Sequence, residues 1–224
     1  MNNAGTLFVV GTPIGNLGDI TRRAVQTLRD VDVVCCEDTR VTAKLLAAYE
    51  IKKPLLSLHE HSDDATIAKV VTMLGEGKSA AYVSDAGTPG VSDPGGKLVA
   101  AVAAAGFSTT PIPGPSALTT ALSVAGFPTE PCTFVGFPPH KKGRNTFFAD
   151  VAGREEAVVL YESTHRIEKT LAALPQDRVA LVGRELTKLH ETLYRGTIAE
   201  VTEQLTKTSS KGEFVIVLAP KFWK

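Results

Sequence analysis

The sequence lacks an excess of charge of either sign. Its 224 residues carry 24 lysines and arginines against 24 aspartates and glutamates. This balance excludes a polybasic coat for nucleic acid but leaves room for a local basic patch. Apolar runs such as residues 98–106 are far too short to span a bilayer, and no charged-then-apolar leader opens the chain. We therefore expect a cytoplasmic protein without a membrane segment.

Cysteine is scarce as well. Cys35 and Cys36 are adjacent in an apolar run, Cys132 stands alone, and no C-x-x-C spacing occurs. This pattern disfavours redox or thiolate-metal chemistry, so we interpret all three cysteines as buried structural thiols. Redox or metal chemistry is the alternative. Strand alternation would place Cys35 and Cys36 on opposite faces of a sheet.

Short β-branched runs alternate with helical patterns through the first half of the chain, as a βαβ arrangement with a parallel sheet requires. The strands expected there are residues 7–10, 31–36, 79–84 and 109–112, and the helices are residues 19–29, 43–49, 65–74 and 96–105. The second half predicts strands at residues 157–161, 179–182 and 214–218 and a helix at residues 166–174.

Three prolines in the segment PIPGPSA, at positions 111, 113 and 115, disfavour a continuous helix or a central strand. We place the domain boundary there. Residues 1–115 then form an N-terminal α/β domain with a parallel sheet, and residues 116–224 form a smaller C-terminal α/β domain.

Two glycine-rich loops follow predicted strands. GTPIGNLG (residues 11–18) has neither G-x-G-x-x-G nor a P-loop lysine, so NAD and ATP are disfavoured. DAGTPGVSDPGG (residues 85–96) would lie at the carboxyl edge of the sheet, where open α/β sheets bind ligands. Gly87 would tolerate a positive φ there. Asp85 would contact a ligand or organise the loop through an Asx turn.

Nine segments carry a resemblance across nearly the whole chain, in the order GTPIGNLGDIT, CCEDTR, LHEHS, VSDAGTPGVSDPG, PIPGPSA, VGFPP, LYESTHR, GRELTK and KGEFV. They are similar to those of the small-subunit ribosomal RNA ribose 2'-O-methyltransferases, a branch of the tetrapyrrole methylase superfamily. The resemblance implies two α/β domains of tetrapyrrole methylase type with S-adenosylmethionine in the cleft between them. It also implies a homodimer that methylates a cytidine ribose in the decoding region of 16S ribosomal RNA.

The resemblance also assigns cofactor contacts, largely through backbone atoms in the first domain. The residues it implies there are Pro13, Ile14, Asp85, Ala86, Gly87, Thr88, Ser116 and Ala117. The positional matches that would close the pocket from the second domain are Tyr161, Glu162, Arg184 and Glu185.

Methyl transfer to a ribose hydroxyl benefits from a general base, because the hydroxyl is a poor nucleophile until its proton is drawn off. Glu37 and Asp38 are the favoured catalytic residues, since a carboxylate at the end of the second strand would face the cleft; alternatively they brace Arg40. His59, His61 and Glu191 are further candidates for the base.

RNA phosphates require fixed cations along their path. The densest basic cluster follows FPP, and a solvated surface loop is the alternative interpretation of it. The residues expected to contact the substrate are Arg40, His59, His61, Lys141, Lys142, Arg144 and Lys188. Arg184 and Lys188 would otherwise make structural ion pairs with Glu185. The HEH run lacks a third ligand at suitable spacing, so we expect no metal.

Two alternatives remain open. A tetrapyrrole or another small molecule is the substrate of much of the superfamily, although SDAGTP, YESTHR and RELTK favour the RNA branch. A non-catalytic module that binds cofactor or RNA is the second alternative. We also expect members of the branch to continue past KGEFVIVL by a small segment that would help to hold RNA, whereas this sequence ends at Lys224.

Overall fold

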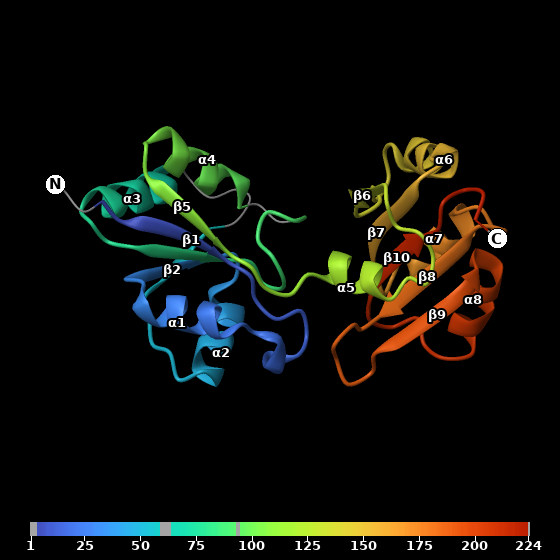
Figure 1. Cartoon of the computed structure of the whole chain (residues 1–224), viewed down its shortest axis with the longest axis horizontal. Helices are drawn as coiled ribbons and strands as arrows, with labels where there is room; N and C mark the ends of the chain where they lie inside the picture. Colours follow the sequence, from blue (N-terminus) through green and yellow to red (C-terminus); the bar gives the residue numbers. More distant parts are fainter. Residues whose placement is uncertain (1–3, 59–63, 93–94, 224) are drawn as a thin grey trace. The chain divides into compact units, whose positions relative to one another are not determined.

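The computed structural model describes residues 4–58, 64–92 and 95–223 and divides into two compact units, Met1–Ser116 and Ala117–Lys224. Each unit holds its own five-stranded sheet with helices packed on it, so both are α/β (Figure 1). None of the helices in the described residues is long and apolar enough to cross a bilayer.

The first sheet is entirely parallel, with the strand order β3-β2-β4-β1-β5. Its strands are β1 (Thr6–Val10), β2 (Val33–Cys36), β3 (Leu55–Ser57), β4 (Ala80–Val83) and β5 (Ser108–Ile112). The helices between them are α1 (Arg22–Asp30), α2 (Thr39–Ala48), α3 (Asp64–Gly75) and α4 (Gly96–Ala104). The expected strands and helices are all present; β3 was not predicted.

Helices cover both faces of this sheet, α1 and α2 on one side and α3 and α4 on the other (Figure 1). Every residue of β2 and β4 is consequently buried, as is usual for a parallel sheet between two helical layers. Cys36 packs in the core with α1 and α2, whereas Cys35 packs in the core with α3 and α4. The prediction that these cysteines point to opposite faces is confirmed.

The start of α1 differs from the expected Asp19. Leu17–Asp19 forms a separate 3-10 turn, η1, and α1 begins only after Thr21. The Thr21 hydroxyl oxygen accepts a hydrogen bond of 3.1 Å from the backbone N–H of Ala24, which satisfies one of the free donors at the helix start. The capping residue therefore decides the boundary, a signal that the apolar spacing alone does not carry.

Pro111 lies inside β5, and the position of this strand explains how the proline is tolerated. Within the sheet β5 pairs only with β1, with Pro111 opposite Val9. An edge strand needs no donor on its open side, so the missing N–H of proline breaks no ladder.

The second sheet is mixed, with the order β6-β7-β10-β8-β9; β6 runs parallel to β7 and the other pairs are antiparallel. Its strands are β6 (Cys132–Gly136), β7 (Ala157–Ser163), β8 (Val179–Arg184), β9 (Thr192–Thr197) and β10 (Glu213–Leu218). Its helices are α5 (Ala117–Ser123), α6 (Arg144–Gly153), α7 (Ile167–Ala173) and α8 (Ile198–Thr206). Of these, β7, β8, β10 and α7 were expected.

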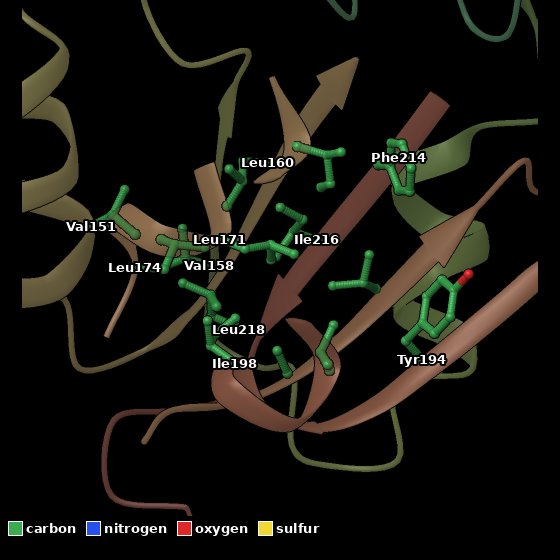
Figure 2. Packing of buried hydrophobic residues seen from close by; sticks show 14 of the residues in the cluster. Val151, Val158, Leu160, Leu171, Leu174, Tyr194, Ile198, Phe214, Ile216 and Leu218 are labelled. Carbon is green, nitrogen blue, oxygen red and sulfur yellow. The ribbon is translucent and has the colours of Figure 1, made fainter. Parts of the chain in front are cut away.

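One apolar cluster joins α6, α7 and α8 to this sheet (Figure 2). Leu171 of α7 and Ile216 of β10 lie at its centre and are fully buried.

Cys132 lies outside this cluster and is exposed, so the expectation that all three thiols are buried was wrong for this one. It begins β6, an edge strand that leaves one side open. Burial raises the pKa of the Cys35 thiol to about 12.

Candidate functional site

The loops that follow β1, β4 and β5 meet at one edge of the first sheet. These strands are neighbours and run parallel, so their carboxyl ends lie together. Thr12, after β1, forms an antiparallel bridge with Gly87, after β4, in which the two backbone N–H groups donate across at 2.8 and 3.2 Å. The buried Thr12 hydroxyl donates to the carbonyl oxygen of Ser84 at 3.3 Å. The first two loops are thereby joined into one main-chain surface.

The conformation of the second loop depends on Gly87. Its φ is +84°, and a Cβ there would lie 3.2 Å from Cγ2 of Ile14. The next residue, Thr88, donates its hydroxyl to the carbonyl oxygen of Pro115 at 3.1 Å. The positive φ expected at Gly87 is confirmed, and the loop touches both of its neighbours at the sheet edge.

The first and third loops approach each other through glycine as well. A Cβ on Gly11 would lie 2.8 Å from Cα of Gly114, and a Cβ on Gly114 would lie 2.8 Å from the carbonyl oxygen of Gly11. Neither position has room for a side chain, because the neighbour is backbone in both cases. Gly11 and Gly114 were not among the predicted site residues, although both belong to glycine-containing segments that the sequence singles out.

The predicted cofactor residues of the first unit gather at this edge. They are Pro13, Ile14, Asp85, Ala86, Gly87, Thr88 and Ser116. Ala117 begins α5 and belongs to the second unit. Thr12 and Ser84 hold the loops together but were missed, and their place at strand ends next to the glycine-rich segments is the signal that indicates them.

Asp85 connects the end of β4 to the start of α2. Its Oδ1 accepts a hydrogen bond of 3.1 Å from the backbone N–H of Asp38. The residue is exposed at the loop surface, so Asp85 both organises the loops and presents a carboxylate to solvent. The organising contact reaches across to a second strand end rather than closing a local Asx turn.

Asp38 is the N-cap of α2 and pairs with Arg40. Asp38 Oδ1 accepts from the Arg40 backbone N–H at 2.8 Å, and Asp38 Oδ2 lies 2.6 Å from Arg40 Nη2. The hydrogen bonds from the Arg40 side chain and backbone lower the pKa of Asp38 to about 2. A carboxylate with so low a pKa is a weak proton acceptor, and this geometry matches the alternative in which Asp38 braces Arg40. Glu37 precedes it and is partly buried.

Tyr161 lies in β7 and joins the start of α5 to an aromatic group. Its hydroxyl oxygen accepts a hydrogen bond of 3.1 Å from the backbone N–H of Leu118. Its ring meets Phe134 and Phe137 edge-on, with ring centroids 4.9 and 5.5 Å away. Ala117, next to Leu118, is thus positioned beside Tyr161 within the second unit.

Glu162, the next residue, is 1% exposed and pairs with groups of the second unit. Oε1 pairs with Arg166 Nη2 at 2.8 Å and accepts from the Ser163 backbone N–H, and Oε2 accepts from the Thr170 hydroxyl at 2.6 Å. Both carboxylate oxygens are therefore occupied by partners within the second unit. Thr170, which completes this network, was not predicted.

Arg184, Glu185 and Lys188 surround the tight turn after β8. Lys188 Nζ lies 3.0 Å from Glu185 Oε1 and 2.8 Å from Glu213 Oε2, which matches the ion-pair alternative for Lys188. Burial would raise the pKa of Glu185, but the hydrogen bonds from Glu213 and Lys188 outweigh it and lower that pKa. Arg184 instead donates Nε to the carbonyl oxygen of Lys211 at 2.6 Å.

The basic cluster after β6 separates into two kinds of cation. Lys141 and Lys142 are exposed. Arg144 is half-buried at the start of α6 and donates to the carbonyl oxygen of Pro139 at 3.2 Å and to the Thr170 hydroxyl at 2.9 Å. Its guanidinium carbon also lies 4.8 Å above the Phe148 ring. The structure thus uses Arg144 internally and leaves the two lysines for solvent or a ligand.

Three further candidates are placed as follows. His59 and His61 lie outside the described residues. Glu191 is exposed, and its Oε2 accepts a hydrogen bond from the backbone N–H of Thr187, so it closes the turn after β8.

Comparison with known proteins decides the family. The sequence model of one protein family, the tetrapyrrole (corrin/porphyrin) methylases, matches residues 6–202 of this chain. The chain belongs to the tetrapyrrole methylase family. A curated relative from Xylella fastidiosa, named ribosomal RNA small subunit methyltransferase I, is 47% identical over 97% of this chain and 82% of its own length. The relative of the same name from Thermotoga maritima is 44% identical over 97% of this chain and 99% of its own length. This tetrapyrrole methylase is accordingly a methyltransferase.

Solved structures agree on the fold. The crystal structure of cobalt precorrin-4 methyltransferase, a cobalamin biosynthetic enzyme, superposes on this chain with a TM-score of 0.69. The superposition covers 96% of this chain and 94% of the other, and the two sequences are 18% identical. At this identity the likeness concerns the fold alone. It confirms the predicted pair of α/β units of tetrapyrrole methylase type.

Proposed function

We propose that this methyltransferase transfers a methyl group from S-adenosylmethionine to the 2'-oxygen of a cytidine ribose in the decoding region of 16S ribosomal RNA. The observation that carries the proposal is the 44–47% identity, over 97% of the chain, to relatives named for the small-subunit ribosomal RNA. The cytidine, the 2'-oxygen and the decoding region come from the motif resemblance. A cytoplasmic homodimer is part of the same proposal.

The sheet edge of the first unit suits this cofactor chemically. S-adenosylmethionine carries a sulfonium and an ammonium cation against one carboxylate, together with ribose hydroxyls. Glu37, Asp38 and Asp85 lie at the ends of β2 and β4; Arg40 offsets the charge of Asp38, and Asp85 is exposed. The linked loops add main-chain polar groups beside it. Opposite charge and hydrogen-bond acceptors together favour a cationic ligand of this kind.

The residues that would hold the cofactor divide by role. Asp85 would accept hydrogen bonds from it, and the neighbouring loop residues Pro13, Ile14, Ala86, Gly87, Thr88, Ser116 and Ala117 would shape its surroundings. In the second unit Tyr161, Arg184 and Glu185 would contribute contacts. Glu162 would act indirectly, because both of its carboxylate oxygens are already used by Arg166, Ser163 and Thr170.

When bound, S-adenosylmethionine supplies an electrophilic methyl group. The chain's part is to hold the ribose hydroxyl in line with that methyl and to accept the hydroxyl proton, and positioning alone accounts for much of such a rate. We assign the role of accepting the hydroxyl proton to Glu37 rather than to Asp38, because the pairing with Arg40 lowers the pKa of Asp38 to about 2. Arg40, Lys141 and Lys142 are the exposed cations assigned to RNA phosphates.

Tritiated methyl transfer tests the proposal. The purified protein should label unmethylated small ribosomal subunits and leave a tetrapyrrole acceptor unlabelled. Label on a 2'-oxygen blocks cleavage of the following phosphodiester, so it should be recovered in an alkali-resistant dinucleotide whose first nucleoside is cytidine. Transfer to the tetrapyrrole alone would establish the small-molecule alternative. Cofactor binding without transfer to either acceptor would establish a non-catalytic module.

A further inference from the structure

The segment between β6 and α6, residues 137–143, is called the basic loop here. No acidic residue occurs between Glu130 and Asp150, although the chain as a whole has equal numbers of acidic and basic residues. Lys141 and Lys142 are exposed, and Phe137 is 50% exposed. The basic loop therefore presents an aromatic ring and two exposed cations from one short stretch of chain.

Two arginines fix the backbone of the basic loop. Arg166 Nη1 donates to the carbonyl oxygen of Pro138 at 2.8 Å, and Arg144 Nη1 donates to that of Pro139 at 3.2 Å. The prolines themselves have restricted φ. Two successive peptide carbonyls are thus held by charged donors, which form stronger hydrogen bonds than neutral ones.

Glu162 anchors both of these arginines. It pairs directly with Arg166, Oε1 to Nη2, at 2.8 Å, and it reaches Arg144 through the Thr170 hydroxyl, with steps of 2.6 and 2.9 Å. Glu162 is 1% exposed, and hydrogen bonds and ion pairs are electrostatically stronger in such a low-dielectric interior than in water. The buried network therefore sets the position of the basic loop relative to the second sheet.

The Phe137 ring is also held from one side. It meets Tyr161 edge-on, with ring centroids 5.5 Å apart and an interplanar angle of 64°. The residue nevertheless remains exposed to solvent. Bases of single-stranded nucleic acid stack on solvent-facing aromatic rings while cations neutralise their phosphates, and the basic loop carries both kinds of side chain.

We infer that the basic loop binds a single-stranded stretch of the RNA substrate, with a base stacked on Phe137 and phosphates contacted by Lys141 and Lys142. Arg166 is a positioning residue for this surface, because it ties Pro138 to Glu162. The inference rests on the proposed function, since it takes the substrate to be RNA. It replaces the three-cation contact expected from the sequence by two lysines and an aromatic ring.

Binding of a fluorescent single-stranded RNA oligonucleotide, measured by anisotropy over a range of salt, separates the two contacts. Replacing both lysines (Lys141→Gln with Lys142→Gln) should reduce the slope of log K against log salt by about 1.4, at about 0.7 per phosphate. Phe137→Ala should leave that slope unchanged and weaken binding roughly tenfold at every salt concentration, because stacking does not release counterions. Phe137→Tyr should restore the affinity.

Phe222→Ala is the matched control, since Phe222 is exposed in the same unit but lies outside the basic loop. It should leave binding unchanged. Equal losses in both phenylalanine variants, or an unaltered salt slope in the lysine variant, would overturn the inference. Equal affinity for a duplex of the same sequence would overturn the stacking contact.

The positioning role of Arg166 has a kinetic test. Arg166→Lys keeps the charge beside Glu162 but loses the planar fork that also reaches Pro138. The KM for small subunits should rise several-fold while kcat and the KM for the cofactor stay the same. Arg195→Lys is the control, because Arg195 makes a comparable carbonyl contact, to Val124 at 2.7 Å, and neither residue belongs to the basic loop. A fall in kcat, or an equal change in the control, would refute the role.

These outcomes are distinguishable from failure of the proposed function. Methyl transfer by the unaltered protein to small subunits, combined with unaffected binding in the loop variants, would overturn the inference and leave the function standing. Absence of transfer to RNA by the unaltered protein would overturn the function whatever the oligonucleotide shows.

Discussion

Replacing Asp85 by alanine should weaken S-adenosylmethionine binding much more than it weakens the fold. The substitution removes an exposed carboxylate at the end of β4 together with its 3.1 Å hydrogen bond from the Asp38 backbone N–H. That hydrogen bond is worth about 1 kcal/mol to folding. A charge-assisted hydrogen bond to the ligand is worth about 1.5–3 kcal/mol, which corresponds to a roughly 10- to 150-fold higher Kd.

Asp85→Asn separates the two roles of this side chain. The amide keeps an oxygen that can accept from Asp38, so the stability should return to that of the unaltered protein, while the charge presented to the ligand is lost. Titration calorimetry with the cofactor and thermal unfolding measure the two effects on the same samples.

Unchanged calorimetric affinity in Asp85→Ala would mean that the cofactor binds elsewhere. Full affinity in Asp85→Asn with a large loss in Asp85→Ala would mean that Asp85 serves only to order the loops. Either result refutes the reasoning that an exposed carboxylate at this sheet edge recognises a cationic ligand.

Three further predictions concern the same edge of the first sheet. Gly87→Ala should destabilise the protein by about 1–2 kcal/mol because of the positive φ, and further because the new Cβ would lie 3.2 Å from Ile14 Cγ2. Gly90→Ala is the control in urea unfolding: its φ is +85° and no atom lies within 4 Å of its Cβ, so it should lose only the free energy that comes from φ. The Asp38 carboxylate should stay ionised until the pH falls to about 2. Its contribution to stability is present above its ordinary pKa of 3.8 and is lost as the pH falls through about 2. An Asp38 carboxyl resonance that titrates near 4 in NMR would contradict the Arg40 pair. Glu37→Gln should lower kcat by a factor of roughly 10²–10⁴ and Asp38→Asn should lower it far less, and the reverse order in single-turnover transfer would exchange their roles.

The first unit could be predicted closely from the sequence, because a parallel sheet buried on both faces leaves continuous apolar strands that are easy to locate. The four strands and four helices expected in it are present, with shifts of a few residues at their ends. β3 was missed because it has only three residues, none of them fully buried. Helix boundaries depended on single caps such as Thr21 rather than on the apolar spacing.

The second unit was harder to predict because its sheet is mixed. β6 and β9 are its edge strands, and most of their residues are only partly buried, so their apolar pattern is weak. The segments for α5 and α6 bury few residues, so their periodicity is weak.

The candidate site was predictable where motifs follow strand ends, as at Asp85. It was not predictable where long-range pairing decides a role. The sequence does not reveal that Glu162 is enclosed by Arg166 and Thr170, or that Arg144 faces Pro139 rather than solvent.

The contact between Gly11 and Gly114 has a consequence for anyone who alters this protein. Each backbone fills the volume that the other would need for even one methyl group, since a Cβ at either position would come within 2.8 Å of the opposite chain. Mutating the two positions together does not relieve the conflict, because the obstacle on each side is main chain. Libraries that randomise either site should return glycine alone, so diversity aimed at this sheet edge is better placed at the neighbouring Pro13 and Ala86.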